Sequence, residues 1–378
     1  MDKSIFKEHE IRGNKDVDFS AKQLYTLANA LAYYFLHVQS PRVKTIALGR
    51  DAHEDSAQVQ QEFTAALTEN GINVIFIGAA PAPVLTFSLH VLPVEAGIYI
   101  TTCPEDSDSL RIRCFNKTEL FDSEALSELN QLYLQPKKVI APLTGTIKYL
   151  PLVERYTQWL ARQFKHLKKS RILCRIECVG SAAALIIPQL VASLKLAECT
   201  FKLDYATGFN SVAAIDVHKT KPLVLSFSYN ADQLFVRTGT GTEVAGNQLS
   251  ALYVQDISLL HPGVVVSDVS SLSLLQQVVQ PGVNVVCEQS STPEKINYRV
   301  KTQHALFGST SNGHFFFNDR YFGYDDGIYA ALRLLDILQR TGKTLEELLY
   351  NLPTISAPRE VSQNFWPSAT TIPEQCLE

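Results

Sequence analysis

Helix-like and strand-like stretches alternate along this chain, and their order constrains the fold more than any other feature of the sequence. A helix with a capping-box start, Ser20 with Gln23 three residues later, is followed by a buried-type strand at 45–49. A second helix over 56–71 and a second apolar run at 74–77 come next. Helix, strand, helix and strand of these lengths predict a parallel α/β sheet with right-handed crossover connections.

This order restarts twice, from about residue 151 and from about residue 251. The further strands that the pattern predicts lie at 97–100, 172–178, 223–228, 264–266, 283–286 and 315–317. A chain of 378 residues is too long for one ordinary domain, because a domain averages ~150 residues. We therefore expect three successive α/β units of roughly 100 residues each.

The composition argues against several classes of protein. A hydrophobic content of 46% supports real cores, and a net charge of −4 gives no reason to expect nucleic acid or an anionic membrane as partner. The seven cysteines form no CxxC pair and are odd in number, so neither a disulfide framework nor a zinc site is expected. The first residues lack the apolar core of a signal peptide, and no apolar stretch is long enough to span a membrane. We expect a cytoplasmic protein.

Open α/β sheets place their ligands at the carboxyl ends of their strands. This principle points at three polar segments, 101–109, 228–233 and 308–314. They are the candidate ligand-binding loops.

Several motifs resemble the bacterial phosphomannomutase/phosphoglucomutase group of the phosphohexomutases. IFKEHEIRG at 5–13 resembles the family's I-F-R-x-Y-D-I-R-G, and GRDAHEDS at 49–56 resembles G-R-D-x-R-x-S-S. GAAPAPVL at 78–85 is similar to G-x-x-P-T-P-V-L, and GHFFFNDRYFGYDDGIYAALRLLDIL at 313–338 follows the family's third domain closely. The resemblance covers about residues 5–356 in the family's order.

The resemblance implies an architecture and a reaction. Family members have four domains around a cleft, which carry a phosphoserine, bind Mg²⁺, read the sugar hydroxyls and grip the substrate phosphate. They interconvert hexose 1- and 6-phosphates through a bisphosphate. By this resemblance the expected fold is three successive mixed-sheet α/β domains, with the C-terminal phosphate-clamp domain absent. The expected boundaries are 1–148 for the phosphoserine domain, 149–250 for a shortened metal domain, 251–356 for the sugar domain and 357–378 for a tail.

At the nucleophile position, the family's T-A-S-H-N-P falls on 101–106 and places Cys103 where the phosphoserine would be. A thiolate needs a positive neighbourhood, whereas three acidic residues follow Cys103 within five positions. This acidic neighbourhood therefore favours an unreactive loop cysteine. Arg113 lies near the family's proton-transfer lysine, but a guanidinium stays protonated and would bind an anion without acting as a base.

The metal loop differs most from the family pattern. D-G-D-x-D-R falls on 228–233, where Ser228 and Asn230 stand at lost ligand positions and Asp232 alone keeps a carboxylate. Mg²⁺ prefers anionic oxygen ligands in octahedral geometry. We therefore expect no cofactor. If the protein is active, we expect it to use Mg²⁺.

The sugar loop G-E-x-S-G-H corresponds to 308–314, which is one residue longer and contains no glutamate. His314 is either a ligand contact or an ordinary strand-end residue, and the sequence does not choose between them. Candidate substrate contacts are Arg12, Arg50, Ser309, Ser311 and His314.

Two functions remain open at this point. The first is a pseudo-enzyme that binds a hexose phosphate or a protein partner without turnover. It is suggested because the residues at every catalytic position of the family are altered or absent. The alternative is an active or altered phosphotransferase that interconverts hexose 1- and 6-phosphates through Cys103. Neither function requires nucleic acid or a membrane.

Overall fold

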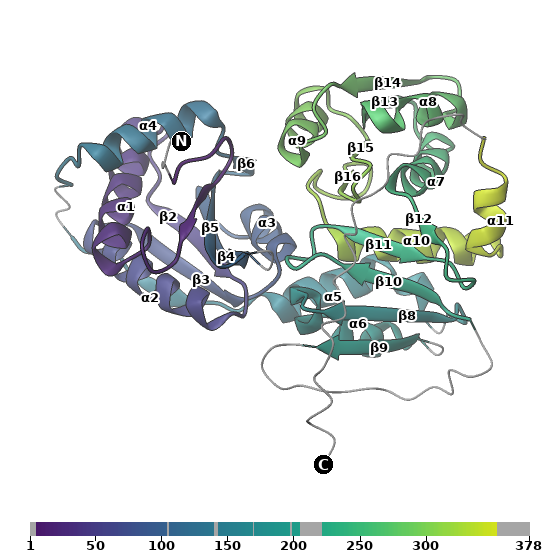
Figure 1. Cartoon of the computed structure of the whole chain (residues 1–378), viewed down its shortest axis with the longest axis horizontal. Helices are drawn as coiled ribbons and strands as arrows, with labels where there is room; N and C mark the ends of the chain where they lie inside the picture. Colours follow the sequence, from purple (N-terminus) through teal and green to yellow (C-terminus); the bar gives the residue numbers. More distant parts are fainter. Residues whose placement is uncertain are drawn as a thin grey trace, which may run out of the picture.

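The computed structural model describes residues 5–103, 106–139, 143–168, 170–196, 199–204 and 221–353. Three sheets follow one another along the chain, each with helices packed on it (Figure 1). This confirms the expected α/β class and the mixed sheets. The boundaries expected at residues 148, 250 and 356 stay predictions. Within the described residues, no helix is both long enough and apolar enough to cross a membrane.

The first sheet has the order β1-β5-β4-β2-β3-β7, with β6 beside β5. Strands β2, β3, β4 and β7 run parallel, as the helix–strand alternation predicts, while β4 and β5 form an antiparallel hairpin. The strands are β1 (Ile11–Asn14), β2 (Thr45–Arg50), β3 (Asn73–Ala79), β4 (Ala96–Cys103), β5 (Asp106–Asn116), β6 (Glu119–Leu120) and β7 (Ile147–Tyr149). The helices are α1 (Ala21–Tyr33), which a π-helical turn (Tyr34–Val38) extends, α2 (Glu54–Glu69), α3 (Ala82–Val91) and α4 (Ser123–Leu134).

The predicted capping box of α1 is wrong in one respect. Ser20 does precede the first helical residue, but its side chain makes no capping hydrogen bond. In α2 the ring nitrogen of His53 accepts the capping bond from the Asp55 amide, at 3.3 Å. The helices are therefore where the apolar periodicity places them, while the sequence pattern misidentifies the cap.

The second sheet has the order β12-β11-β10-β8-β9. Its parallel strands β9, β8 and β10 are extended by the antiparallel arm β11–β12, and the connection of that arm turns where the Gly241 amide donates to the Thr238 carbonyl. The strands are β8 (Cys174–Val179), β9 (Cys199–Asp204), β10 (Leu223–Phe227), β11 (Leu234–Arg237) and β12 (Glu243–Val244). The helices are α5 (Val153–Gln163) and α6 (Ile187–Leu194), with 3-10 turns at Lys165–Leu167 and Ala182–Leu185.

The third sheet has the order β14-β13-β15-β16. The strands are β13 (Gly263–Asp268), β14 (Val283–Glu288), β15 (Phe307–Ser309) and β16 (Phe315–Phe317). The helices are α7 (Gly246–Ser258), α8 (Val269–Val278), α9 (Pro293–Thr302), α10 (Gly327–Thr341) and α11 (Leu345–Tyr350). Helix α10 also packs on β10 and β11, so the third unit contributes a layer to the second sheet (Figure 1).

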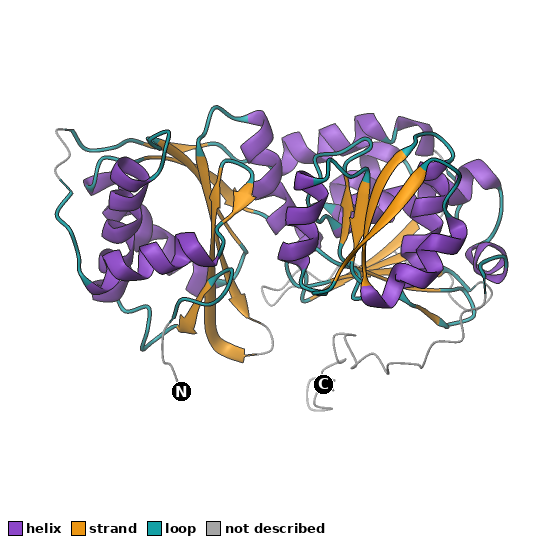
Figure 2. Cartoon of the chain, turned by 90° about the horizontal axis from the view of Figure 1, so that it is seen from above, coloured by secondary structure: helices purple, strands orange, loops and turns teal. Residues whose placement is uncertain are grey.

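The first sheet buries both of its faces (Figure 2). In β2, Ile46 and Leu48 belong to the core under α1, α2 and α4, whereas Ala47 belongs to a second core. Adjacent strand residues point to opposite faces, so these two cores lie on the two sides of the sheet. The second core continues through the second and third units. Such a shared core fixes the three carboxyl-end loops relative to one another.

Candidate functional site

The loop between β10 and β11, residues 228–233, connects several parts of the molecule. Within the loop, the Ser228 hydroxyl donates to the Asp232 carboxylate at 2.6 Å. Toward the first unit, the Thr101 hydroxyl bonds the Asn230 side-chain oxygen at 2.8 Å. The hydroxyls of Thr102 and Tyr229 are also bonded, at 2.7 Å. The positions that resemble metal ligands therefore bond to protein groups.

The same loop contacts the third unit. The Gln233 side-chain amide donates to the Asn312 carbonyl at 3.0 Å, and the Leu234 amide donates to the Gly313 carbonyl at 3.0 Å. The Gly327 amide, at the start of α10, donates to the Ala231 carbonyl at 3.0 Å. Segments 101–109, 228–233 and 308–314 thus meet through their described residues.

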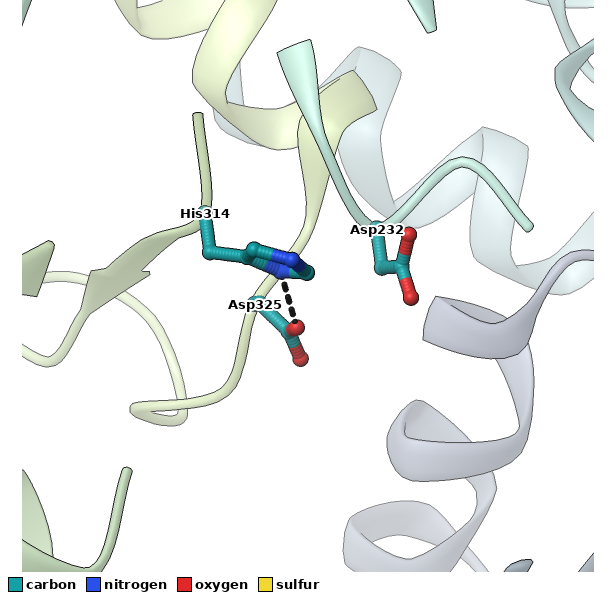
Figure 3. A group of neighbouring side chains, drawn as sticks. All are labelled: Asp232, His314 and Asp325. Atoms are coloured by element: carbon teal, nitrogen blue, oxygen red, sulfur yellow. Dashed lines mark hydrogen bonds and ion pairs between the residues drawn. The ribbon is translucent and has the colours of Figure 1, made fainter. Parts of the chain in front are cut away.

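A compact charged group lies where these loops meet (Figure 3). The Nδ1 atom of His314 bonds the Asp325 carboxylate at 2.7 Å. One ligand-type atom from each of Asp232, His314 and Asp325 lies within 4.8 Å of the others. Figure 3 shows the His314 ring pointing between the two carboxylates. We call these three residues the Asp–His–Asp group.

Burial and charge act in opposite directions on this group. Burial alone would lower the pKa of His314, but the bond to Asp325 and the charge of Asp232 outweigh it, and the pKa is raised. Burial would likewise raise the pKa of Asp232, but the charges of His314 and Arg113 hold the pKa below its ordinary value. The surroundings of the group therefore favour the charged form of His314 and the ionised form of Asp232.

Arg113, on β5 of the first unit, completes the electrostatics. Its Nη1 atom is 3.5 Å from Asp232 Oδ2, and its Nε atom is 3.7 Å from Glu10 Oε2. Burial alone would lower the pKa of Arg113, but the charge of Asp232 outweighs it and the pKa is raised. The anions that this arginine contacts are thus carboxylates of the protein itself.

The other residues that the sequence suggests as site residues lie on separate elements. Ser309 is fully buried at the end of β15, and the Ser311 amide donates to Asp268 at 2.7 Å. Arg50 donates to the carbonyl of Asp51 at 2.8 Å. Arg12 lies on β1 opposite Arg111. Cys103 is the last residue of β4, and its side chain lies outside the described part of the chain.

A cavity of about 390 Å³ opens beside the Asp–His–Asp group, with walls from all three units. Arg113, Asp232 and Asp325 line one part of it. Lys295 and Lys301 of α9 line another part, where Lys301 donates to the Thr118 carbonyl and Lys295 pairs with Glu8 at 3.2 Å. A volume of ~300–1,000 Å³ is typical of small-molecule sites.

Sequence reasoning missed Asp325 as a site residue. The signal was present in the adjacent pair Asp325–Asp326 ahead of Gly327. Neighbouring residues of an extended segment point opposite ways, so one carboxylate of such a pair can cap a helix while the other faces the site. Asp326 caps α10 by accepting from the Tyr329 amide at 2.9 Å, and Asp325 faces His314.

Three α/β sheets whose loops meet at a charged group beside a cavity define a multi-unit α/β protein with a cavity between its units. Residues 3–135 match the family model "Phosphoglucomutase/phosphomannomutase, alpha/beta/alpha domain I". Residues 245–355 match the corresponding model for domain III. The chain belongs to the phosphohexomutase superfamily.

Relatives and solved structures agree with this assignment. A phosphomannomutase/phosphoglucomutase of Pseudomonas putida is 25% identical, over 94% of this chain and 78% of the relative. The solved structure of a phosphoglucomutase/phosphomannomutase family protein from Burkholderia thailandensis has a TM-score of 0.79 at 20% identity, covering 95% of this chain and 81% of that one. The N-acetylphosphoglucosamine mutase of Aspergillus fumigatus, solved with GlcNAc-6P and magnesium, has a TM-score of 0.53 at 13% identity, covering 84% and 67%.

The 228–233 loop is a weak match to the ligands that Mg²⁺ prefers. This ion requires near-octahedral oxygen coordination with anionic ligands, and only Asp232 supplies a carboxylate here. That carboxylate already accepts from Ser228 and faces Arg113, while the Asn230 oxygen bonds Thr101. The Asp–His–Asp group is a different set of ligand-type atoms, with an imidazole that Mg²⁺ does not favour.

Proposed function

We propose that this member of the superfamily has lost mutase turnover and acts as a sugar-phosphate-binding or regulatory pseudo-enzyme. One observation carries the proposal: the loop that resembles the family's metal loop supplies a single carboxylate, Asp232, which accepts from Ser228 and faces Arg113. Phosphoryl transfer in this family resembles other metal-assisted transfers, in which the ion neutralises charge that develops on the transferred group. Without that neutralisation the transfer lacks its main electrostatic support.

The cavity supports ligand binding without metal. Arg113, Lys295 and Lys301 place cationic groups along its walls, and a phosphate group binds to such groups. Acidic residues line the same cavity, namely Glu119, Asp122, Asp232, Glu294 and Asp325. A bisphosphate would meet more repulsion from these carboxylates than a monophosphate would. We therefore infer weak binding of a hexose monophosphate.

The turnover assay tests the proposal directly. Purified protein with Mg²⁺ and a hexose bisphosphate activator is expected to show no interconversion of glucose or mannose 1- and 6-phosphates above background. The Pseudomonas putida relative serves as the positive control under the same conditions. Calorimetric titration with glucose 6-phosphate is expected to give the same affinity with and without Mg²⁺. Interconversion at a rate comparable with the control would refute the loss of turnover.

A second candidate function is phosphotransfer through Cys103. The observation that favours it is the place of Cys103 at the end of β4, directly after the two threonines that bond the 228–233 loop. Incubation with glucose 1,6-bisphosphate followed by intact-mass measurement distinguishes the two functions. The pseudo-enzyme predicts no phosphate adduct, whereas phosphotransfer predicts an adduct on wild type that disappears in Cys103→Ala. Cys174→Ala is the matched control, because Cys174 is buried in β8 away from the loop.

A further inference from the structure

Two basic side chains from different units meet at one buried carboxylate. The Asp232 side chain is only 9% exposed, and Arg113 Nη1 approaches its Oδ2 atom to 3.5 Å. His314, which reaches it from the third unit, is held by Asp325 at 2.7 Å. A buried carboxylate needs a compensating positive charge, and here the protein supplies that charge itself.

The ligand-type atoms of the Asp–His–Asp group would otherwise suit a divalent ion. Two carboxylates and one imidazole lie within 4.8 Å of one another, a donor set that Mn²⁺ and Zn²⁺ accept. Arg113 opposes such an ion by direct charge repulsion across Asp232. The guanidinium is itself fixed from the other side by Glu10, 3.7 Å from its Nε atom.

We propose that the Arg113 guanidinium is the resident cation of this centre, in place of a divalent ion, and that its removal opens a site for Mn²⁺ or Zn²⁺ on Asp232, His314 and Asp325. The inference rests on the proposed function, since both require that the junction works without metal. The inference adds that Arg113, from the first unit, supplies the positive charge beside Asp232 of the second unit.

The experiment compares Mn²⁺ binding by wild type, Arg113→Gln and Arg113→Lys, using calorimetry and thermal shift on the full chain. Arg113→Gln is expected to bind Mn²⁺ at least about tenfold more tightly than wild type, because the repelling charge is gone while all three ligands remain. Arg113→Lys keeps the charge and is expected to resemble wild type. Arg175→Gln is the matched control, since Arg175 also pairs with a glutamate, at 3.8 Å, but lies on β8.

The double variant R113Q/H314N assigns the ligands. It is expected to lose the Mn²⁺ affinity that R113Q gains, whereas gained affinity that survives in the double variant would place the ion elsewhere and overturn the proposal. A folded R113Q without gain would overturn it too. Should R113Q fail to fold, the wild-type titration decides: saturable Mn²⁺ binding that is lost in His314→Asn overturns the proposal, and its absence supports it. Turnover in the mutase assay would defeat the proposed function without changing any of these titrations.

Discussion

Replacing Arg333 by methionine is expected to lower the free energy of unfolding by ~3–5 kcal/mol. The Arg333 side chain is fully buried in α10, and its guanidinium bonds both carboxylate oxygens of Asp319, at 2.8 and 2.9 Å. Asp256 of α7 lies 3.5 Å from the same guanidinium. Methionine fills similar space but leaves the buried Asp319 carboxylate with Arg320, at 3.4 Å, in place of its bidentate partner. Urea unfolding followed by circular dichroism measures the loss.

Arg340 provides the matched control on the same helix. It bonds the same Asp256, at 2.6 Å, but its side chain is 44% exposed. Arg340→Met is expected to cost less, ~1 kcal/mol, because the guanidinium is half-exposed and both of its carboxylate partners, Asp256 and Asp336, keep Arg320 nearby. The double variant R333M/D319N should be more stable than R333M, because the stranded charge has been removed. Equal losses in R333M and R340M would show that burial does not set the contribution of this pair.

Eight of the strands were predictable because they follow from apolar periodicity. Strands β2, β3, β4, β8, β10, β13, β14 and β16 lie where that periodicity places them, within a few residues. Strand β15 was missed because it has only three residues and contains Gly308, so no alternation can develop. The buried network of Arg333 was missed for a related reason. A single arginine between leucines in a helix does not reveal its partners, which lie on other elements.

Loops at the carboxyl ends of strands were predictable as ligand-facing segments, but the three loops belong to three separate sheets, so their meeting was not predictable. What the loops do there was not predictable from spacing. The hydroxyl bonds of Thr101 and Thr102 to Asn230 and Tyr229 depend on side chains far apart in the sequence. The partner of His314 was likewise not predictable, because the sequence does not show that Asp325 faces His314 while the neighbouring Asp326 caps α10.

Asp326 should make wild-type stability fall as the pH rises. Its carboxylate is fully buried and accepts from the hydroxyls of Tyr156, on α5, and Tyr321, so it links the second and third units. Burial raises the pKa of Asp326 from its ordinary value of 3.8 to about 6. The folded state therefore holds this proton more tightly, and the resulting stability is present below pH 3.8 and lost as the pH passes about 6. The shift corresponds to about 3 kcal/mol.

Asp326→Asn isolates this contribution because the amide cannot ionise. The stability of wild type minus that of D326N, from urea unfolding at each pH, is expected to fall by up to about 3 kcal/mol between pH 4 and pH 7. Asp122→Asn is the matched control: Asp122 also caps a helix, accepting from the Ala125 amide at 2.9 Å, but it is exposed. Its difference from wild type should show no such fall. A D326N difference that stays constant with pH would mean that the Asp326 carboxylate is solvated or ionised without penalty, and that the two tyrosine hydroxyls suffice to hold its charge at the unit junction.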